Sequence, residues 1–366
     1  MKEYKYLYQK MLDPKIVRLA YNKLRKGKTK RPEIQYIDIH YEEESNKIIE
    51  MIFNTKPDGV YVPRPDLAYR PTFIKPTIIK EYVKTRKIYK PEMIDQWIHH
   101  IIVIILEPII LSHAYCLSCG SMPKKGGLYG KKHIARWIKR GVDIKYFAKM
   151  DIRHFFASVK YDILFNWLRV RINDEWFLYF IRLCFMQFKK GLILGFYISQ
   201  WLSNYLLESL DRYIIEWLGH KKYIRYVDDI VIFANSKKIL HRSIESIKQF
   251  LKKRLHLKLK KNYKVCKFDY HGKGTFLDFM GFKFYRYKIT LRKRILKASV
   301  KLARKLYRDR FYGKRFYLKH IRAILSYMGW FKHTNSYKVY MRKIKHFVDL
   351  GHLKAIISHI DTKNNS

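Results

Sequence analysis

Two long segments carry hydrophobic residues every three or four positions, the spacing of a helix with one buried face. The first covers residues 199–218, with Ser199 as the expected capping residue and Gly219 as the stop. The second covers residues 240–255. Their apolar positions are Leu202, Leu206, Leu210 and Ile214 in the first segment, and Leu240, Ile244, Ile247, Leu251 and Leu255 in the second. Residues 161–172 show the same spacing over a shorter length.

The most apolar stretch of the chain is Met93–Leu111. It contains Asp95, two histidines and Glu107, and its unbroken apolar part, Ile101–Leu106, is far too short to span a bilayer. We therefore expect a buried helix that ends or kinks near Pro108, since proline disrupts the interior of a helix.

Two adjacent acids, Asp228 and Asp229, interrupt an otherwise apolar segment over residues 223–234. Aspartate is disfavoured inside strands but tolerates the dihedral angles of turns. The segment therefore predicts a hairpin with both acids at its tip. A separate strand is predicted within residues 144–156, where it leads into Asp151.

The two ends of the chain have helical patterns. They cover the first 60 or so residues and residues 286–366, the latter interrupted at Gly313 and Gly329. Glycine, proline and basic residues elsewhere predict loops and a further strand or hairpin. The expected loops are residues 22–34 and 120–132, and the expected strand or hairpin is residues 276–285.

Positive charge dominates the composition. The chain has 366 residues with 77 Lys and Arg against 30 Asp and Glu, a formal net charge of +47. Such an excess is self-repelling unless a polyanion is near, and neutralising phosphates releases counterions. We therefore favour a nucleic-acid partner over the alternative, the compositional bias of an AT-rich genome. The length suits one large domain or two to three small ones.

Cysteine usage and the amino terminus indicate a reducing compartment. The terminus is charged and tyrosine-rich rather than a secretory signal, so we expect a cytoplasmic protein with no membrane partner. Cys116 and Cys119 have the spacing of half a zinc site, with His113 or His133 nearby. A structural zinc needs a second ligand pair, so two ordinary thiols are the preferred interpretation.

The three acids predict a site for divalent cations. Adjacent carboxylates repel and cannot be buried without positive charge, and Asp151 can converge with them from its own strand. Mg²⁺ accepts one or two carboxylates together with substrate phosphates. Two such ions about 4 Å apart activate an attacking oxygen and stabilise a leaving one in phosphoryl transfer. Because successive strand residues point to opposite faces, we assign Asp228 as the direct ligand and Asp229 as a supporting charge.

The order of several motifs is more specific than any single acid. These motifs are Arg86–Ile88 followed by Pro91, Asp95 and His99; Asp151 with Phe155 and Phe156; residues 191–211; Tyr226–Asp229; and Phe276–Phe282. Together they resemble the reverse transcriptases of bacterial retroelements, the relatives of group II intron and retron enzymes, from about Ala20 to Tyr340.

The resemblance implies an α+β right-hand polymerase fold with fingers, a palm built on an antiparallel sheet, and a helical thumb. An N-terminal extension and the fingers would occupy residues 1–143, and the palm residues 144–285. Residues 173–195 would contribute to the junction of fingers and palm. The thumb would occupy residues 286–366.

The resemblance also implies roles for individual residues. Asp151, Asp228 and Asp229, with the backbone of Ile152, look like the catalytic metal site. Several residues look like the nucleotide-binding set. Lys84 and Arg86 would bind the triphosphate, and Phe156 with its neighbour Phe155 would be the steric gate against a ribose 2′-OH. Leu194 and Gly195 would lie beside the new base pair, and Lys264, which is near Lys258, Lys260 and Lys261, would donate a proton to pyrophosphate. Phe279, Met280 and Gly281 match the primer grip. Phe156 as ordinary core packing and Lys84 as a surface charge are the alternatives.

The implied activity is RNA-directed DNA synthesis, in which a primer 3′-OH attacks a dNTP and pyrophosphate leaves. Two Mg²⁺ ions would serve as cofactors, and Mn²⁺ can substitute. The implied partners are an RNA template, a DNA or RNA primer, dNTPs, a structured non-coding RNA and a small accessory protein.

One departure from the common pattern points to a subclass. Leu194 precedes Gly195 and Gln200 follows Ser199, where most relatives have Gln and Pro. This pattern is similar to the reverse transcriptases of diversity-generating retroelements. Leucine cannot hydrogen-bond the nucleotide, which predicts low fidelity. A reverse transcriptase of a phage-defence system, template-dependent or not, and a maturase-like RNA-binding protein without polymerase activity are the alternatives.

Overall fold

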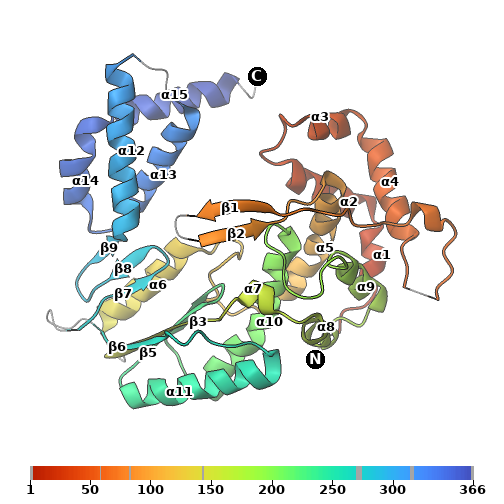
Figure 1. Cartoon of the computed structure of the whole chain (residues 1–366), viewed down its shortest axis with the longest axis horizontal. Helices are drawn as coiled ribbons and strands as arrows, with labels where there is room; N and C mark the ends of the chain where they lie inside the picture. The colour runs from red at the N-terminus through yellow and green to blue at the C-terminus, as the bar shows by residue number, and fades with distance from the viewer. Residues whose placement is uncertain are drawn as a thin grey trace. The chain divides into compact units, whose positions relative to one another are not determined.

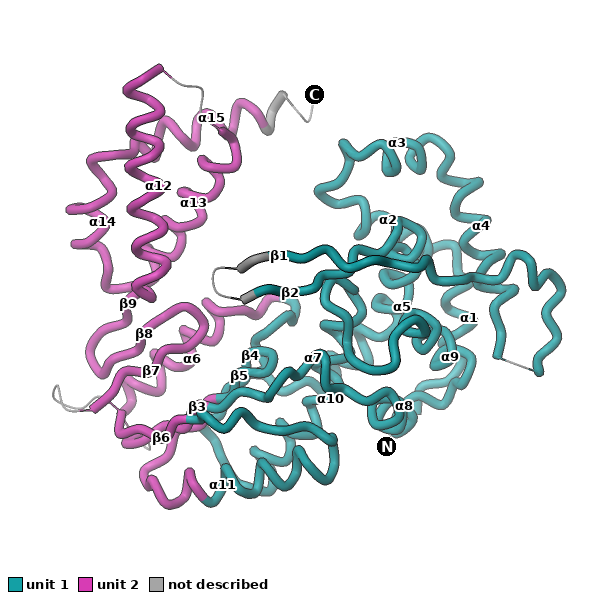
Figure 2. Tube along the Cα trace, in the orientation of Figure 1, with its two compact units in different colours: residues 1–123, 150–230, 242–263 teal, residues 124–149, 231–241, 264–366 magenta. Residues whose placement is uncertain are grey.

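The structure is a computed structural model that describes residues 3–57, 59–81, 84–141, 144–268, 274–313 and 317–363. It contains helices and antiparallel strands, which confirms the α+β class (Figure 1). The chain divides into two compact units, each described by itself (Figure 2). Unit 1 comprises residues 1–123, 150–230 and 242–263, and unit 2 comprises residues 124–149, 231–241 and 264–366. The division into fingers, palm and thumb stays a prediction.

Helices make up most of unit 1. They are α1 (Leu7–Met11), α2 (Pro14–Arg25), α3 (Pro32–Ile39), α4 (Tyr41–Phe53), α5 (Met93–Leu111), α7 (Phe155–Ser158), α8 (Tyr161–Arg169), α9 (Glu175–Leu183) and α10 (Tyr197–Arg212). A short 3₁₀ turn, η1 (Pro65–Leu67), precedes the first strands. Helix α11 (Lys237–Phe250) starts in the sequence of unit 2 and continues in unit 1. The predicted helices at residues 161–172, 199–218 and 240–255 are therefore confirmed in type.

Helix α5 is the buried helix that its apolar sequence predicts. It packs against α2 and α10, and Trp97, Ile101 and Leu106 are each at most 1% exposed. Within the described residues it is the one helix long and apolar enough to cross a membrane, and 61% of its most apolar window is buried. The buried core helix of a protein outside a membrane can be equally long and apolar. The helix continues through Pro108 and ends at Leu111, three residues later; a kink at the proline stays a prediction. Burial of Ile109 and Ile110 holds the last turn in place.

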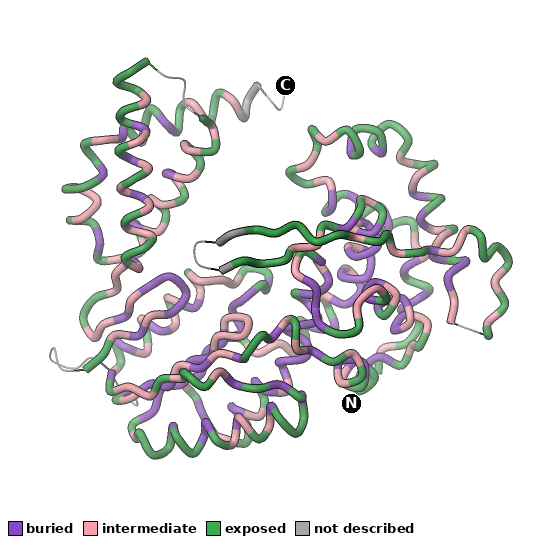
Figure 3. The backbone as a smooth tube through the Cα atoms, in the orientation of Figure 1, coloured by how far each residue is buried: buried purple, intermediate pink, exposed green. Residues whose placement is uncertain are grey.

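The strands form three sheets. A hairpin joins β1 (Thr77–Glu81) to β2 (Lys84–Ile88), and most of its length is exposed (Figure 3). A four-stranded sheet has the order β4 (Tyr223–Tyr226), β5 (Asp229–Ala234), β3 (Tyr146–Asp151), β6 (Lys264–Lys267). A three-stranded sheet contains β7 (Leu277–Phe279), β8 (Phe282–Phe284) and β9 (Ile289–Leu291). The strand leading into Asp151, the hairpin with the acidic tip and the hairpin within residues 276–285 are confirmed.

The rest of unit 2 is helical. Its helices are α6 (Gly127–Arg140), α12 (Lys293–Phe311), α13 (Leu318–Lys332), α14 (Tyr337–Lys343) and α15 (Leu350–Lys363), with a 3₁₀ turn η4 (Lys345–Phe347). Phe147 of β3, Phe233 of β5 and Phe268, which follows β6, pack together with ring centroids 5.7 to 6.2 Å apart and form an aromatic cluster on the four-stranded sheet. Phe282 packs on Trp330 of α13 at 5.0 Å.

Three expectations about helix limits are wrong. Helix α6 occupies the second half of the loop expected at residues 120–132, and α2 and α3 take both ends of the loop expected at 22–34. Helix α13 runs through Gly329 without interruption, whereas Gly313, at φ 64°, does follow the end of α12. A glycine inside a helix costs about 1 kcal/mol. In α6, burial of Ile134 and Ile138 outweighs that cost.

The start of α10 also differs from the expectation. The helix begins at Tyr197, so Ser199 lies in its first turn and does not cap it. The Ser199 hydroxyl instead accepts a hydrogen bond from the N–H of Ile193 at 3.0 Å and ties the preceding loop to the helix. The helix continues as a π-helical turn, η2 (Tyr213–Trp217), and Gly219 follows at φ 67°, as expected of a stop. Helix α11 likewise ends in a π-helical turn, η3 (Leu251–Leu255).

Candidate active site

The acidic hairpin tip joins β4 to β5 through Val227 and Asp228. Val227 has φ 57°, the left-handed region, which a β-branched residue rarely adopts. Gly120 lies directly against this turn, because a Cβ added to it would come within 2.5 Å of the backbone nitrogen of Val227. The turn is therefore a strained conformation that its surroundings must hold in place.

Asp151 and Asp228 come together in unit 1, although they are far apart in the sequence. The N–H of Ile152, the residue after Asp151, donates to the carbonyl oxygen of Asp228 at 3.3 Å. Burial raises the pKa of the Asp228 carboxyl to about 6, and repulsion from Asp151 and Asp229 contributes to the same rise. Burial and like charge therefore both disfavour the ionised Asp228 carboxylate, which a bound cation would stabilise.

Lys260 is a cation that contacts Asp151 of this pair. Its Nζ lies 2.5 Å from Oδ1 of Asp151, an ion pair without hydrogen-bond geometry. The backbone sets this contact: the N–H of Lys260 donates to the carbonyl of Asp151 at 2.8 Å, and the N–H of Arg153 donates to the carbonyl of Lys258 at 2.7 Å. Asp151 and Lys260 are therefore direct neighbours across two paired segments.

The motifs imply Lys264 as the proton donor to pyrophosphate, and this role stays a prediction. Lys264 lies on β6 opposite Lys149, within unit 2. The alternation of leucine and lysine over residues 257–260 is the strand signal that could have identified Lys260, since Leu257 and Leu259 are buried.

The carboxylates fit a divalent cation in part. No group of three His, Cys, Asp or Glu side chains close enough to enclose a metal is preformed in the part of the chain that the structure describes. Asp151 and Asp228 provide two carboxylates, and Oδ1 of Asp151 already has a cationic partner in the Lys260 ammonium. Mg²⁺ bound by one or two carboxylates takes its other ligands from phosphates and water, so two are sufficient. The roles of Asp229, at the start of β5, and of the Ile152 backbone stay predictions.

Cys116 and Cys119 lie on a segment that pairs with β4. The N–H of Cys119 donates to the carbonyl of Arg225 at 2.8 Å, and the N–H of Arg225 donates to that of Leu117 at 3.1 Å. Cys119 is buried and Cys116 is exposed. The segment therefore supports the hairpin from its outer edge.

Gly195 is required by a close approach of two backbones. It has φ 106°, and a Cβ placed on it would lie 1.9 Å from the carbonyl oxygen of Tyr89. The N–H of Tyr89 donates to the carbonyl of Leu194 at 2.8 Å. The glycine is therefore required by the segment that follows β2, and its implied place beside the new base pair stays a prediction.

A comparison with protein-family models decides the family. The model described as reverse transcriptase (RNA-dependent DNA polymerase) matches residues 78–284, more than half of the chain. The chain belongs to the reverse transcriptase family. Its fold is accordingly the right-hand polymerase fold that the motifs imply.

The individual relatives found for this chain are distant. The chain is 28% identical over 139 residues to the Retron Ec73 reverse transcriptase of Escherichia coli, covering 33% of this chain and 43% of that protein. Telomerase from Candida albicans, solved with a TWJ fragment of telomeric RNA, aligns with TM-score 0.46 and 12% identity over 72% of this chain and 54% of that one. Apo telomerase from Candida tropicalis aligns with TM-score 0.46 and 11% identity over 78% and 56%. The chain spans about half the length of these relatives.

The implied steric gate lies in unit 1. Phe155 is buried at 2% exposure and packs edge-to-face on Phe156 at 5.5 Å. Phe156 is only half-buried, so part of its ring is open to a ligand. Its carbonyl accepts from the N–H of Leu192 at 2.7 Å, which links the gate to the loop that carries Leu194 and Gly195.

The implied triphosphate-binding residues lie on β2. Arg86 is exposed and pairs with Ile79 of β1 in the strand register. The backbone of Lys84 belongs to β2, but its side chain lies outside the described residues. Both roles stay predictions.

The implied primer grip forms the turn between β7 and β8 in unit 2. Phe279 is fully buried, and Met280 and Gly281 have φ 50° and 87°. A Cβ on Gly281 would lie 2.7 Å from the ring of Trp330, so only glycine allows α13 to pack here. The three residues shape the turn, and their contact with a primer stays a prediction.

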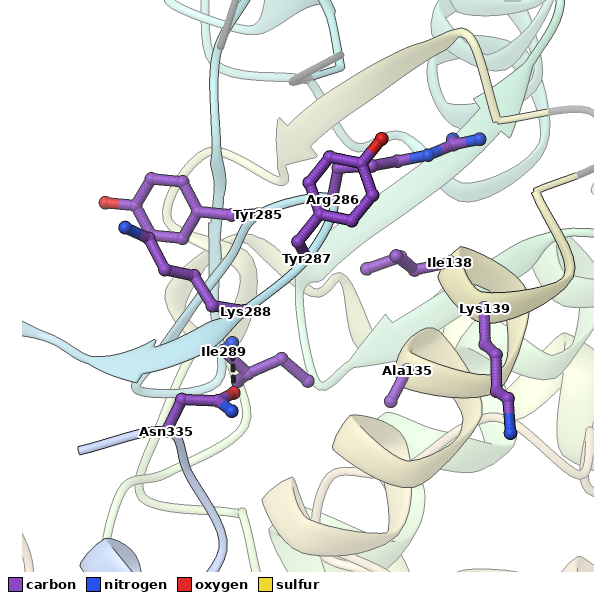
Figure 4. A pocket seen from close by; sticks show the side chains of 9 residues that line it. All are labelled: Ala135, Ile138, Lys139, Tyr285, Arg286, Tyr287, Lys288, Ile289 and Asn335. Atoms are coloured by element: carbon purple, nitrogen blue, oxygen red, sulfur yellow. Dashed lines mark hydrogen bonds between the residues drawn. The ribbon is translucent and has the colours of Figure 1, made fainter. Parts of the chain in front are cut away.

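Unit 2 also contains a cavity of about 480 Å³ between α6, residues 285–289 and Asn335 (Figure 4). The Oδ1 atom of Asn335 accepts from the N–H of Ile289 at 2.8 Å. Tyrosine, lysine and arginine side chains line the cavity, and its described lining contains no carboxylate. It therefore has none of the metal-binding chemistry of the acidic pair.

Proposed function

We propose that this chain is an RNA-directed DNA polymerase, which extends a DNA or RNA primer with dNTPs on an RNA template in the cytoplasm. The observation that carries the proposal is the convergence of Asp151 and Asp228, with the pKa of Asp228 raised to about 6, in a chain of the reverse transcriptase family. The net charge of +47 suits a nucleic-acid substrate.

Each residue of the site has a role in this proposal. Asp151 and Asp228 would hold Mg²⁺, or Mn²⁺ in its place, with Asp229 as a supporting charge. Two bound ions would supply activation of the primer 3′-OH and stabilisation of the leaving pyrophosphate. Lys260 balances the charge of Asp151 and lies where it can meet a phosphate group. Arg86 and Lys84 bind the triphosphate, and Phe156 excludes nucleotides with a 2′-OH.

Primer extension by the purified chain tests the proposal. The assay uses an RNA template annealed to a DNA primer, dNTPs and Mg²⁺, and compares the wild type with Asp228→Asn. Glu216→Gln is the matched control, because Glu216 is an exposed acid of unit 1. We expect extension by the wild type and the control and none by Asp228→Asn. RNA binding without extension in either Mg²⁺ or Mn²⁺ would instead support the maturase-like alternative.

The subclass is part of the proposal. We favour an error-prone enzyme of a diversity-generating retroelement, acting with a structured non-coding RNA and a small accessory protein, over a phage-defence enzyme. Leu194 and Gln200 motivate this choice. Leu194 is half-buried beside Gly195 and has no polar group to offer a nucleotide. Sequencing the products from a mixed RNA template tests it: Leu194→Gln is expected to lower the error rate, and an unchanged error rate contradicts the subclass.

A further inference from the structure

Arg225 is a buried charge three residues before Asp228. Its side chain lies on β4 and is 1% exposed. Nε and Nη2 each donate to one carboxylate oxygen of Asp211, at 2.7 Å, and Asp211 is equally buried. Nη1 donates to the carbonyl oxygen of Val227 at 2.9 Å and to Oδ1 of Asn204 at 3.3 Å. The guanidinium therefore joins helix α10 to the tip of the hairpin.

The ion pair by itself does not explain why a charge is buried here. A buried ion pair is often no more stabilising than apolar residues of similar volume, because both charges lose their hydration. What an apolar residue could not replace is the bond from Nη1 to the carbonyl of Val227. Asp211 also accepts from the hydroxyl of Tyr223 at 2.5 Å, so its own position is fixed and it can orient the guanidinium.

Val227 is the residue that needs such support. Its left-handed backbone, at φ 57°, is strained for a β-branched side chain. Gly120 also lies in close contact with Val227, and the carbonyl of Gly120 accepts from Nδ2 of Asn204 at 3.0 Å. Asn204 thus bonds both Arg225 and the Gly120 segment, and so links the two supports of the turn.

We propose that Arg225 is a positioning residue of the active site: it locks Val227 in the left-handed conformation and so sets the direction in which the next residue, Asp228, presents its carboxylate. Asp211 and Asn204 orient Arg225. This inference rests on the proposed function for its effect on catalysis, but its effect on cation binding can be measured without any nucleotide.

The test combines two substitutions. Arg225→Lys keeps the charge for Asp211, but one ammonium lacks the fork that reaches Asp211 and Val227 together. Val227→Gly removes the strain, because glycine adopts positive φ without cost. Four proteins are compared: the wild type, each single variant and the double variant. Each is assayed for terbium binding by luminescence and for kcat and KM in primer extension.

In the wild-type background, we expect Arg225→Lys to weaken terbium binding about tenfold and to lower kcat about 10- to 100-fold, within the range that releasing backbone strain allows. The KM for the template–primer should be unchanged. In the V227G background, both effects of Arg225→Lys should shrink to about threefold or less, because glycine adopts the left-handed conformation without strain and no longer needs the bond from Arg225.

Arg171→Lys is the matched control. Arg171 is also buried, at 9% exposure, and forms a two-pronged ion pair with Glu208 at 2.6 and 2.8 Å. The Arg171→Lys variant should be less stable than the wild type but should bind terbium with unchanged affinity. If Arg225→Lys fails to fold, Asp211→Asn is tested in its place. Its effects on terbium binding and kcat should be smaller than those of Arg225→Lys, and they should also shrink in the V227G background.

Equal effects in both backgrounds, or unchanged terbium affinity in Arg225→Lys, would overturn the inference. If the wild type binds terbium but extends no primer, the proposed function fails, while the terbium results still decide the role of Arg225.

Discussion

Asp228→Asn is expected to stabilise the metal-free protein while it abolishes DNA synthesis. Burial, then repulsion from Asp151 and Asp229, raises the pKa of Asp228 from its ordinary 3.8 to about 6. At about 1.36 kcal/mol per pH unit, the ionised carboxylate costs at most ~3 kcal/mol in the folded state. Because the group is partly open to solvent, ~1–2 kcal/mol is the expected gain on replacing it with a neutral amide.

The sign of the pH dependence follows from the raised pKa. Between about pH 4 and pH 6 the folded wild type binds more protons than the unfolded chain, so its free energy of unfolding falls as the pH rises through this window. The amide does not titrate. The advantage of Asp228→Asn should therefore be near zero at pH 4 and complete above pH 6.

Urea unfolding in EDTA at several pH values measures this difference, with Glu216→Gln as the control that should stay within ~0.5 kcal/mol of the wild type. Adding Mg²⁺ should stabilise the wild type more than Asp228→Asn, because the ion compensates the charge that the variant lacks. The reasoning is refuted if metal-free Asp228→Asn is no more stable than the wild type at pH 7.5, or if its advantage does not depend on pH.

Three further predictions concern neighbours of this site. Lys260→Met removes a charge that lowers the pKa of Asp228, so the acidic limb of the pH–activity profile should move to higher pH, whereas exposed Lys261→Met should not move it. Gly195→Ala places a Cβ 1.9 Å from the carbonyl of Tyr89 and should cost ~2–4 kcal/mol in urea unfolding. Gly219→Ala, with positive φ but nothing within 4 Å, should cost less, and equal losses would contradict the role of the contact. Phe156→Val should raise ribonucleotide incorporation at least about tenfold relative to dNTPs in primer extension, and unchanged selectivity would assign the ring to packing.

Local chemistry predicted much of the candidate site. Alternation identified β3 up to Asp151, and the poor fit of two acids to a strand interior placed Asp228 in a turn. Helical spacing identified α10 and α11, because apolar residues at this period line up on one face only when the segment is helical. Helix limits were less well predicted: α6 begins at Gly127 and α13 passes Gly329, since burial of apolar neighbours outweighs the modest cost of a glycine.

The sequence by itself determined the helices and strands next to the acids, the basic character of the chain and the identity of the acids. Only the tertiary structure decided which distant groups lie beside the residues of the site: Lys260 beside Asp151, Tyr89 against Gly195, and Arg225 bonded to the carbonyl of Val227. The physical reason is that periodicity fixes which face of a segment a side chain occupies, whereas the partner of that face depends on strand register and helix packing between segments far apart in the chain.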